Sequence, residues 1–150
     1  MSRNSIITNA SPTAVFAVLD DPYAYPRWVV GARRVRAVDP SWPSIGSRFH
    51  HALGTPAAEL HDSSKILERD PPRRLLLEVR FRPTGIATVA IDVRAHGPGT
   101  VITIEEHPTD GPVAHVPRWV IEPVLGVRNA IALRRLRREV QRASSDVSVP

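Results

Sequence analysis

Three polar side chains, His51, Glu106 and Asn129, are predicted to lie on faces that are otherwise apolar. In such a setting an imidazole or a carboxyl group can move a proton, and an amide can donate a hydrogen bond to an oxygen that gains negative charge. Buried polar groups normally have partners, so the three could equally satisfy one another, a loop backbone or an ordered water. Both interpretations stay open: internal partners, or the polar groups of a binding cavity.

Strand periodicity places two of these residues. In a strand predicted over 47–53, His51 shares a face with Phe49, because side chains alternate across a strand. In a strand predicted over 100–107, Glu106 lies on the inner face. A tight His-Gly-Pro-Gly turn precedes that strand and predicts antiparallel pairing. Short β-branched or alternating segments predict five more strands, the third without clear alternation: 3–9, 33–38, 60–68, 75–81 and 87–94.

Helical periodicity places Asn129. A long helix is predicted from about Pro117 or Pro123 to about Arg142. At about 100° per residue its apolar face comprises Leu125, Ala132, Leu133, Leu136 and Val140. Asn129 interrupts this face. The opposite side is apolar in the first half of the helix and basic in the second half.

Two helices are predicted between the first strand and the others. Ser11 followed by Pro12 is typical of a helix start, and a second short helix is predicted over 22–30. The order predicts an α+β fold: a curved antiparallel sheet of about six to seven strands, covered by the only helix long enough to do so. We expect one domain over 1–142 and a disordered tail over 143–150.

The charge of the chain is concentrated near its end. The 150 residues carry 20 basic and 15 acidic side chains, for a net charge of +5. Six arginines lie after residue 127, where only Glu139 and Asp146 oppose them. The arginines are not interleaved with aromatic residues, and no helix-turn-helix context surrounds them. The pattern therefore disfavours a nucleic-acid partner despite the basic composition.

Several classes of site are excluded or left without support. The chain has no cysteine, which removes disulfides, thiolate nucleophiles and cysteine-ligated metals. His50 and His51 are adjacent, so on a strand they point to opposite faces and cannot share one metal. We predict no metal and no cofactor. No apolar run reaches the roughly 20 residues of a membrane span, and the first nine residues lack a signal-peptide core, which favours a cytoplasmic protein.

Short segments along almost the whole chain carry a resemblance to a known family. In order they are Ala10 to Pro12, Trp28 to Gly31, Arg33 to Arg36, Asp39 to Pro43, Gly46 to His51, Asp70 to Leu75, Glu105 to Pro108 with Gly111-Pro112, Arg128-Asn129 and Leu133 to Leu136. Together they resemble the START/SRPBCC superfamily, and more narrowly the bacterial polyketide cyclase/dehydrase and lipid-transport family. The resemblance implies a helix-grip fold, with a deep apolar cavity between the sheet and the long helix.

The resemblance also implies a ligand class. Members bind lipids, sterols or polyketides, and only some catalyse cyclisation or dehydration. Residues of the inner faces and of two helix entrances would then contact the ligand: Trp28, Phe49, His51, Leu77, Val79, Ile91, Ile104, Glu106, Trp119, Asn129 and Leu133. We expect a binder or carrier of a small hydrophobic molecule, and as the alternative a cyclase, aromatase or dehydratase with Glu106 or His51 as acid/base. No catalytic residue is assigned, and a homodimer is kept as an option.

Overall fold

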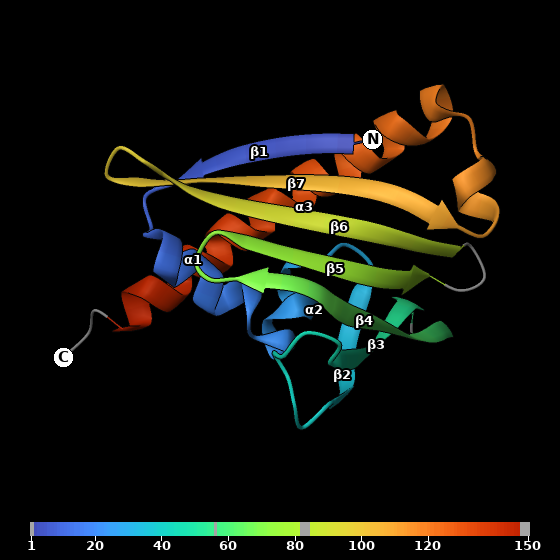
Figure 1. The fold of residues 1–150 in the computed structure, drawn as a ribbon, viewed down its shortest axis with the longest axis horizontal. Helices are drawn as coiled ribbons and strands as arrows, with labels where there is room; N and C mark the ends of the chain where they lie inside the picture. The colour runs from blue at the N-terminus through green and yellow to red at the C-terminus, as the bar shows by residue number, and fades with distance from the viewer. Residues whose placement is uncertain (1, 56, 82–84, 148–150) are drawn as a thin grey trace.

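The structure is a computed structural model that describes residues 2–55, 57–81 and 85–147. Figure 1 shows an antiparallel sheet with one long helix across one of its faces. The elements, in chain order, are β1 (Ser2–Thr8), α1 (Pro12–Leu19), η1 (Pro22–Ala24), α2 (Tyr25–Trp28), β2 (Ala32–Val38), β3 (Arg48–Thr55), β4 (Ala58–Asp70), β5 (Arg74–Phe81), β6 (Gly85–His96), β7 (Gly99–Asp110), η2 (Pro112–His115) and α3 (Arg118–Val147). The predicted order of elements is confirmed.

The sheet has seven strands in the order β1-β7-β6-β5-β4-β3-β2. Every neighbouring pair is antiparallel, and β2 to β7 follow one another as a meander because short turns connect them. β1 leaves this order and pairs with β7, so the first and last strands of the chain lie side by side (Figure 1). The predicted α+β fold, with a sheet of six to seven strands gripping a terminal helix, is confirmed.

α3 is held on the sheet by one apolar side and by a bond at the sheet edge. Leu125, Ala132, Leu133, Leu136 and Val140 are all buried, as the helical periodicity predicted. At the edge strand β1, the Asn4 amide donates a hydrogen bond of 3.1 Å to the backbone oxygen of Gly126. The first half of the helix is therefore anchored at the end of the sheet where β1 and β7 pair.

The two short helices close the opposite end of the space under the sheet. The Ser11 hydroxyl accepts a hydrogen bond of 3.1 Å from the Ala14 amide and caps α1, as predicted. The end of α1 is tied to β4 because Asp20 accepts two hydrogen bonds from the Arg69 guanidinium. α1 and α2 therefore have fixed positions against the sheet.

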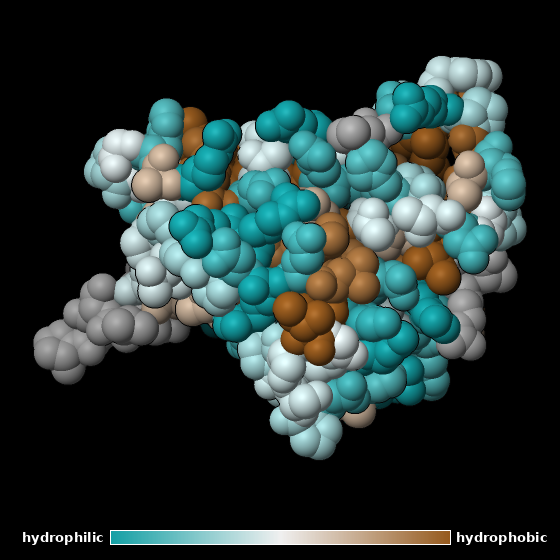
Figure 2. Space-filling model, viewed as in Figure 1, coloured by the Kyte–Doolittle hydropathy of each residue, from teal (hydrophilic) through white to brown (hydrophobic). Residues whose placement is uncertain are grey.

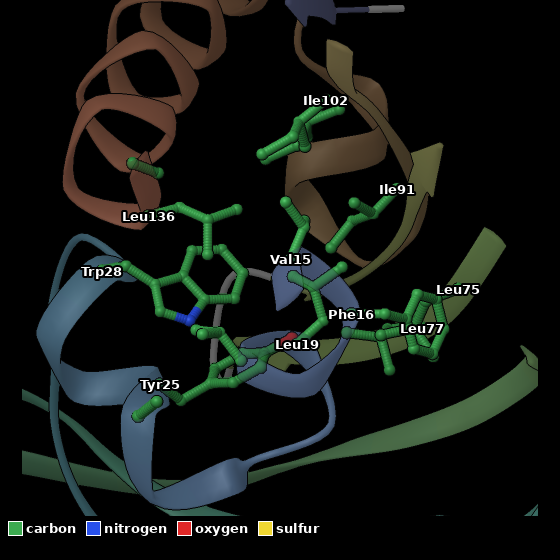
Figure 3. Packing of buried hydrophobic residues seen from close by; sticks show 14 of the residues in the cluster. Val15, Phe16, Leu19, Tyr25, Trp28, Leu75, Leu77, Ile91, Ile102 and Leu136 are labelled. Atoms are coloured by element: carbon green, nitrogen blue, oxygen red, sulfur yellow. The ribbon is translucent and has the colours of Figure 1, made fainter. Parts of the chain in front are cut away.

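The hydrophobic core fills the space between these helices, α3 and the inner face of the sheet. Figure 3 shows Trp28 and Leu136 in this cluster, together with Phe16 of α1 and Leu75 and Leu77 of β5. All five side chains are buried. Because each comes from an element that has a polar opposite face, burial of the apolar faces drives the layers together.

The other face of the sheet is turned to solvent. Figure 2 shows this side of the molecule as mostly hydrophilic, with a small hydrophobic area over the central strands. Arg74 on this face forms ion pairs with Asp92 at 3.0 Å and with Glu68 at 3.2 Å. No helix within the described residues is long and apolar enough to cross a membrane.

The main difference from the sequence expectations lies at the end of the chain. We expected a disordered tail from residue 143, but α3 continues to Val147. The segment contains neither proline nor glycine before Pro150, so nothing in the backbone ends the helix at Arg142. The last three expected tail residues lie outside the described residues.

Candidate functional site: a buried cavity between the sheet and α3

A cavity of about 50 Å³ lies between the inner face of the sheet and the first half of α3. That volume could hold roughly four water molecules. Most of its wall is apolar and comes from the segment after α2, from five strands and from α3: Val29, Val30, Ala32, Leu53, Val79, Val89, Ile104 and Ala132. The cavity is therefore small, partly open and mainly hydrophobic in this conformation.

The polar side chains predicted to face inward all reach this cavity. His51 of β3, Glu106 of β7 and Asn129 of α3 line it together. Each of the three is at least nine-tenths buried. No hydrogen bond joins any two of these three side chains, so they do not satisfy one another, although His51 and Glu106 each have another side chain as partner. Ser64 of β4 and Arg128 of α3 complete the polar part of the wall.

His51 is held by a serine on the neighbouring strand. Its Nε2 atom lies 3.1 Å from the Ser64 hydroxyl oxygen, and both side chains are buried. Its ring packs at a centroid distance of 5.5 Å from Phe49, which also contacts the ring of Tyr25 at 4.5 Å. Burial lowers the pKa of His51 to about 4, although the nearby Asp62 opposes that shift. At neutral pH the cavity therefore holds a neutral imidazole.

Glu106 has a different partner, which the sequence did not suggest. The Arg128 Nη1 atom lies 3.3 Å from the nearer Glu106 carboxylate oxygen and 3.4 Å from the other. The carboxylate is buried, while the guanidinium is about a quarter exposed. This pair compensates the buried charge of Glu106 with a cation that reaches toward solvent.

Three residues that line the cavity each carry a buried nitrogen atom with no partner within the described part of the chain. The atoms are Nε1 of Trp28, Nδ1 of His51 and Nδ2 of Asn129. Native proteins pair the large majority of buried polar atoms, so three unpaired atoms around one cavity are unusual. The residues around the cavity therefore have hydrogen-bonding capacity that the described part of the protein does not use.

A second hollow adjoins the cavity and opens outward. It has a volume of about 290 Å³ and includes Leu125 of α3 and Val113 of η2 in its wall. It shares Glu106, Arg128 and two apolar residues with the buried cavity. The Glu106–Arg128 pair consequently borders both spaces, and we refer to the outer one as the mouth.

The structure places the other sequence-predicted contact residues at varying distances from this cavity. Trp28, Val79 and Ile104 line it together with the polar trio. Four others are buried in the core but are not in its wall: Phe49, Leu77, Ile91 and Leu133. Trp119, expected at a cavity rim or in the core, is 78% exposed on the first turn of α3. Leu125, six residues further along α3, faces the sheet instead, because Trp119 and Leu125 lie on different sides of the helix.

Sequence reasoning missed two polar residues of the site. Ser64 was missed because alternation in β4 is broken by a register shift between Ile66 and Glu68. Ser64 lies directly opposite Phe49 in the pairing of β3 with β4. Because Phe49 faces inward, this pairing shows that Ser64 faces inward too, but the register of the two strands is not known from the sequence. Arg128 lies at the side of the α3 wheel, and no sequence signal connects it with Glu106.

Comparison with known proteins adds the evolutionary context. A family model described as "Polyketide cyclase / dehydrase and lipid transport" matches residues 2–141. None of the curated proteins matches the chain.

Solved structures resemble the fold at low sequence identity. The di-domain ARO/CYC StfQ from the steffimycin biosynthetic pathway has a TM-score of 0.73 at 13% identity, over 95% of this chain and 51% of that one. Ara h 8.0201 has a TM-score of 0.69 at 14% identity, over 93% of this chain and 95% of that one. Protein CV1439 from Chromobacterium violaceum has a TM-score of 0.67 at 17% identity, over 90% and 93% of the two chains. At these identities the likeness concerns the fold.

Proposed function

Because the chain belongs to the polyketide cyclase / dehydrase and lipid transport family, we propose that it binds a small hydrophobic molecule in the cavity between the sheet and α3. One observation carries the proposal: the cavity has apolar walls with a few converging polar groups, among them His51, Glu106 and Asn129. This is the composition expected of a site that binds an apolar molecule and orients it.

The size of the cavity limits how such a molecule is bound. The inner cavity, about 50 Å³, is too small for a lipid or a polyketide, whereas the adjoining mouth adds about 290 Å³. The ligand would extend from the cavity into the mouth, past Glu106 and Arg128. Binding would therefore require these two side chains, and the first half of α3, to move apart.

A fluorescence titration tests this proposal. N-phenyl-1-naphthylamine, a neutral apolar probe, should bind saturably with one site per chain. Ala132 lines the cavity, so Ala132→Leu should weaken binding by about tenfold or more by filling part of the space. Ala130 is half-buried outside the cavity wall, and Ala130→Leu serves as the matched control.

Two results would contradict the proposal. One is the absence of saturable binding to the folded wild-type protein. The other is equal binding by both leucine variants, with circular dichroism showing that Ala132→Leu is folded.

A second candidate function, a cyclase or dehydratase, is favoured by the convergence of three groups on one cavity. His51 or Glu106 would remove the α-proton of a β-ketone, and Asn129 would donate a hydrogen bond to the resulting enolate oxygen. Turnover of a poly-β-ketone substrate should then fall sharply in Glu106→Gln or His51→Ala. Unchanged turnover in both variants would eliminate this candidate while leaving the binding function intact.

A further inference from the structure

The unpaired nitrogen atoms of the cavity indicate which atoms a ligand must present. Trp28, His51 and Asn129 are 3%, 4% and 5% exposed, so bulk water does not satisfy their unpaired atoms. Two of these atoms, the indole Nε1 of Trp28 and the amide Nδ2 of Asn129, carry hydrogen and can only donate. Each needs an acceptor that the described part of the protein does not supply.

The histidine can act either as a donor or as an acceptor. The Nε2 atom of His51 lies 3.1 Å from the Ser64 hydroxyl oxygen, and the tautomer of the ring decides which of the two groups donates. The requirement for an acceptor on the ligand therefore comes from Trp28 and Asn129.

The charge in the cavity wall limits the acceptor further. Glu106 places a buried carboxylate there, and the Arg128 guanidinium is already paired with it. A ligand carboxylate would meet this negative charge at close range and would lose its own hydration. The wall is thus rich in donors but unfavourable for an added anion.

Resting on the proposed function, we infer that the ligand is an uncharged apolar molecule with at least one carbonyl oxygen, accepted by the donors of Trp28 and Asn129. Ketones, quinones, esters and amides belong to this class. A fatty-acid anion and a plain hydrocarbon do not, since the first adds a buried charge and the second leaves the donors unpaired.

Three probes of nearly equal shape separate these classes. They are 2-acetylnaphthalene, its isostere 2-isopropenylnaphthalene, which has a methylene group in place of the oxygen, and 2-naphthoate. By calorimetry at neutral pH the ketone should bind about tenfold more tightly than the isopropenyl compound, and the carboxylate should bind most weakly. In nitrogen–proton correlation spectra, only the ketone should shift the Trp28 indole and Asn129 amide signals downfield.

Matched variants assign this preference to the cavity donor. Asn129→Leu should bring the affinities for ketone and isopropenyl compound close together, whereas Gln141→Leu, on the exposed side of the same helix, should leave their ratio unchanged. Equal binding of the two neutral probes to wild type, or tightest binding of 2-naphthoate, would overturn this inference and leave the binding function standing. Failure of all three probes to bind would overturn both.

A different observation carries a second proposal, which concerns the outer side of α3. Five large apolar side chains lie exposed along its first half, and we call them the α3 stripe: Trp119, Val120, Val124, Val127 and Ile131. Trp119, Val124 and Val127 are 78%, 59% and 64% exposed. Scattered exposed apolar residues are ordinary, but a continuous row on one helix face marks an interaction surface.

Positive charge continues the α3 stripe along the same helix face. Arg134, Arg135 and Arg138 are exposed and have no ion-pair partner among the residues that the structure describes. At about 100° per residue they follow the stripe, whereas Glu122 and Glu139 fall outside it. An apolar row with tryptophan, followed by arginines, is the pattern of a helix that lies at a membrane surface.

We propose that the α3 stripe docks on an anionic lipid surface. A second copy of the chain fits less well, because this face carries no acidic residue to oppose the arginines. Leu125 and Arg128 of the same helix segment line the mouth, so docking would bring the mouth close to the lipid.

Vesicle sedimentation tests the docking. The protein should bind vesicles of phosphatidylcholine mixed with phosphatidylglycerol and not vesicles of phosphatidylcholine alone. Val127→Glu should reduce binding by about tenfold or more, and Arg134→Gln with Arg135→Gln should weaken it and its salt dependence. Ile45→Glu is the matched control, because it replaces another exposed apolar side chain, in the loop between β2 and β3, by the same acidic residue. Absence of vesicle binding, or a wild-type dimer that Val127→Glu converts to a monomer, would overturn the proposal.

Discussion

The Arg128 guanidinium lies 3.3 Å from the Glu106 carboxylate, and this ion pair borders both the inner cavity and its open mouth. The carboxylate comes from the inner face of β7 and the cation from α3. The pair therefore joins the sheet to the helix at the point where a ligand would enter.

Removal of one member of this pair should cost more stability than removal of both. Arg128→Met leaves a buried carboxylate without its cation, and we expect a loss of about 2 kcal/mol, less than for a fully buried pair because the guanidinium is partly exposed. Glu106→Gln combined with Arg128→Met should recover part of that loss. Urea unfolding of the single and double variants at neutral pH measures the difference. Strictly additive losses would show that the two side chains do not interact.

Acid should weaken the fold through His51. Burial holds the pKa of His51 at about 4 in the folded protein, below the value of about 6.5 of a free imidazole. Between these values the unfolded chain binds more protons, so the stability that is complete above pH 6.5 is lost as the pH falls toward 4. The full loss is about 3 kcal/mol.

Variants separate this contribution from that of the carboxyl groups. His51→Gln should flatten the pH dependence of the unfolding free energy between about pH 6.5 and pH 4. His96→Gln changes an exposed histidine and should follow wild type. Parallel pH profiles for wild type and His51→Gln would show that His51 is not buried as a neutral ring.

Alkali should distinguish the two tyrosines of the chain. Tyr25 is buried between Trp28 and Phe49, and burial raises the pKa of its phenol above the usual range, whereas Tyr23 is 62% exposed. An absorbance titration near 295 nm should therefore show no ionisation of Tyr25 before the protein unfolds. Compared with wild type, Tyr25→Phe should lose only the tyrosinate signal that appears with unfolding. Loss of signal from the folded protein in Tyr25→Phe would contradict the burial of Tyr25.

The two sides of α3 should differ in their effect on stability. Leu136→Ala removes a fully buried side chain beside Trp28 and should cost about 3 kcal/mol in the free energy of unfolding (Figure 3). Val124→Ala, on the exposed α3 stripe, should change it by no more than about 0.5 kcal/mol. Thermal or urea unfolding measures both, and a large cost for Val124→Ala would mean that the stripe is covered in solution.

The sequence alone determined the fold and the inward direction of the polar trio. Alternation in β3 and β7 and the helical period of α3 are local patterns, and each assigns a residue to a face without reference to the rest of the chain. For that reason His51, Glu106 and Asn129 could be placed on inner faces, and the structure buries all three.

Only the tertiary structure decided what those residues meet. The register between β3 and β4, which pairs Phe49 with Ser64, brings the Ser64 hydroxyl to His51. The position of α3 along the sheet brings Arg128 to Glu106 and leaves the Asn129 amide unpaired. Pairing, cavity volume and unpaired atoms depend on distances between segments far apart in the sequence, and a local periodicity carries no information about such distances.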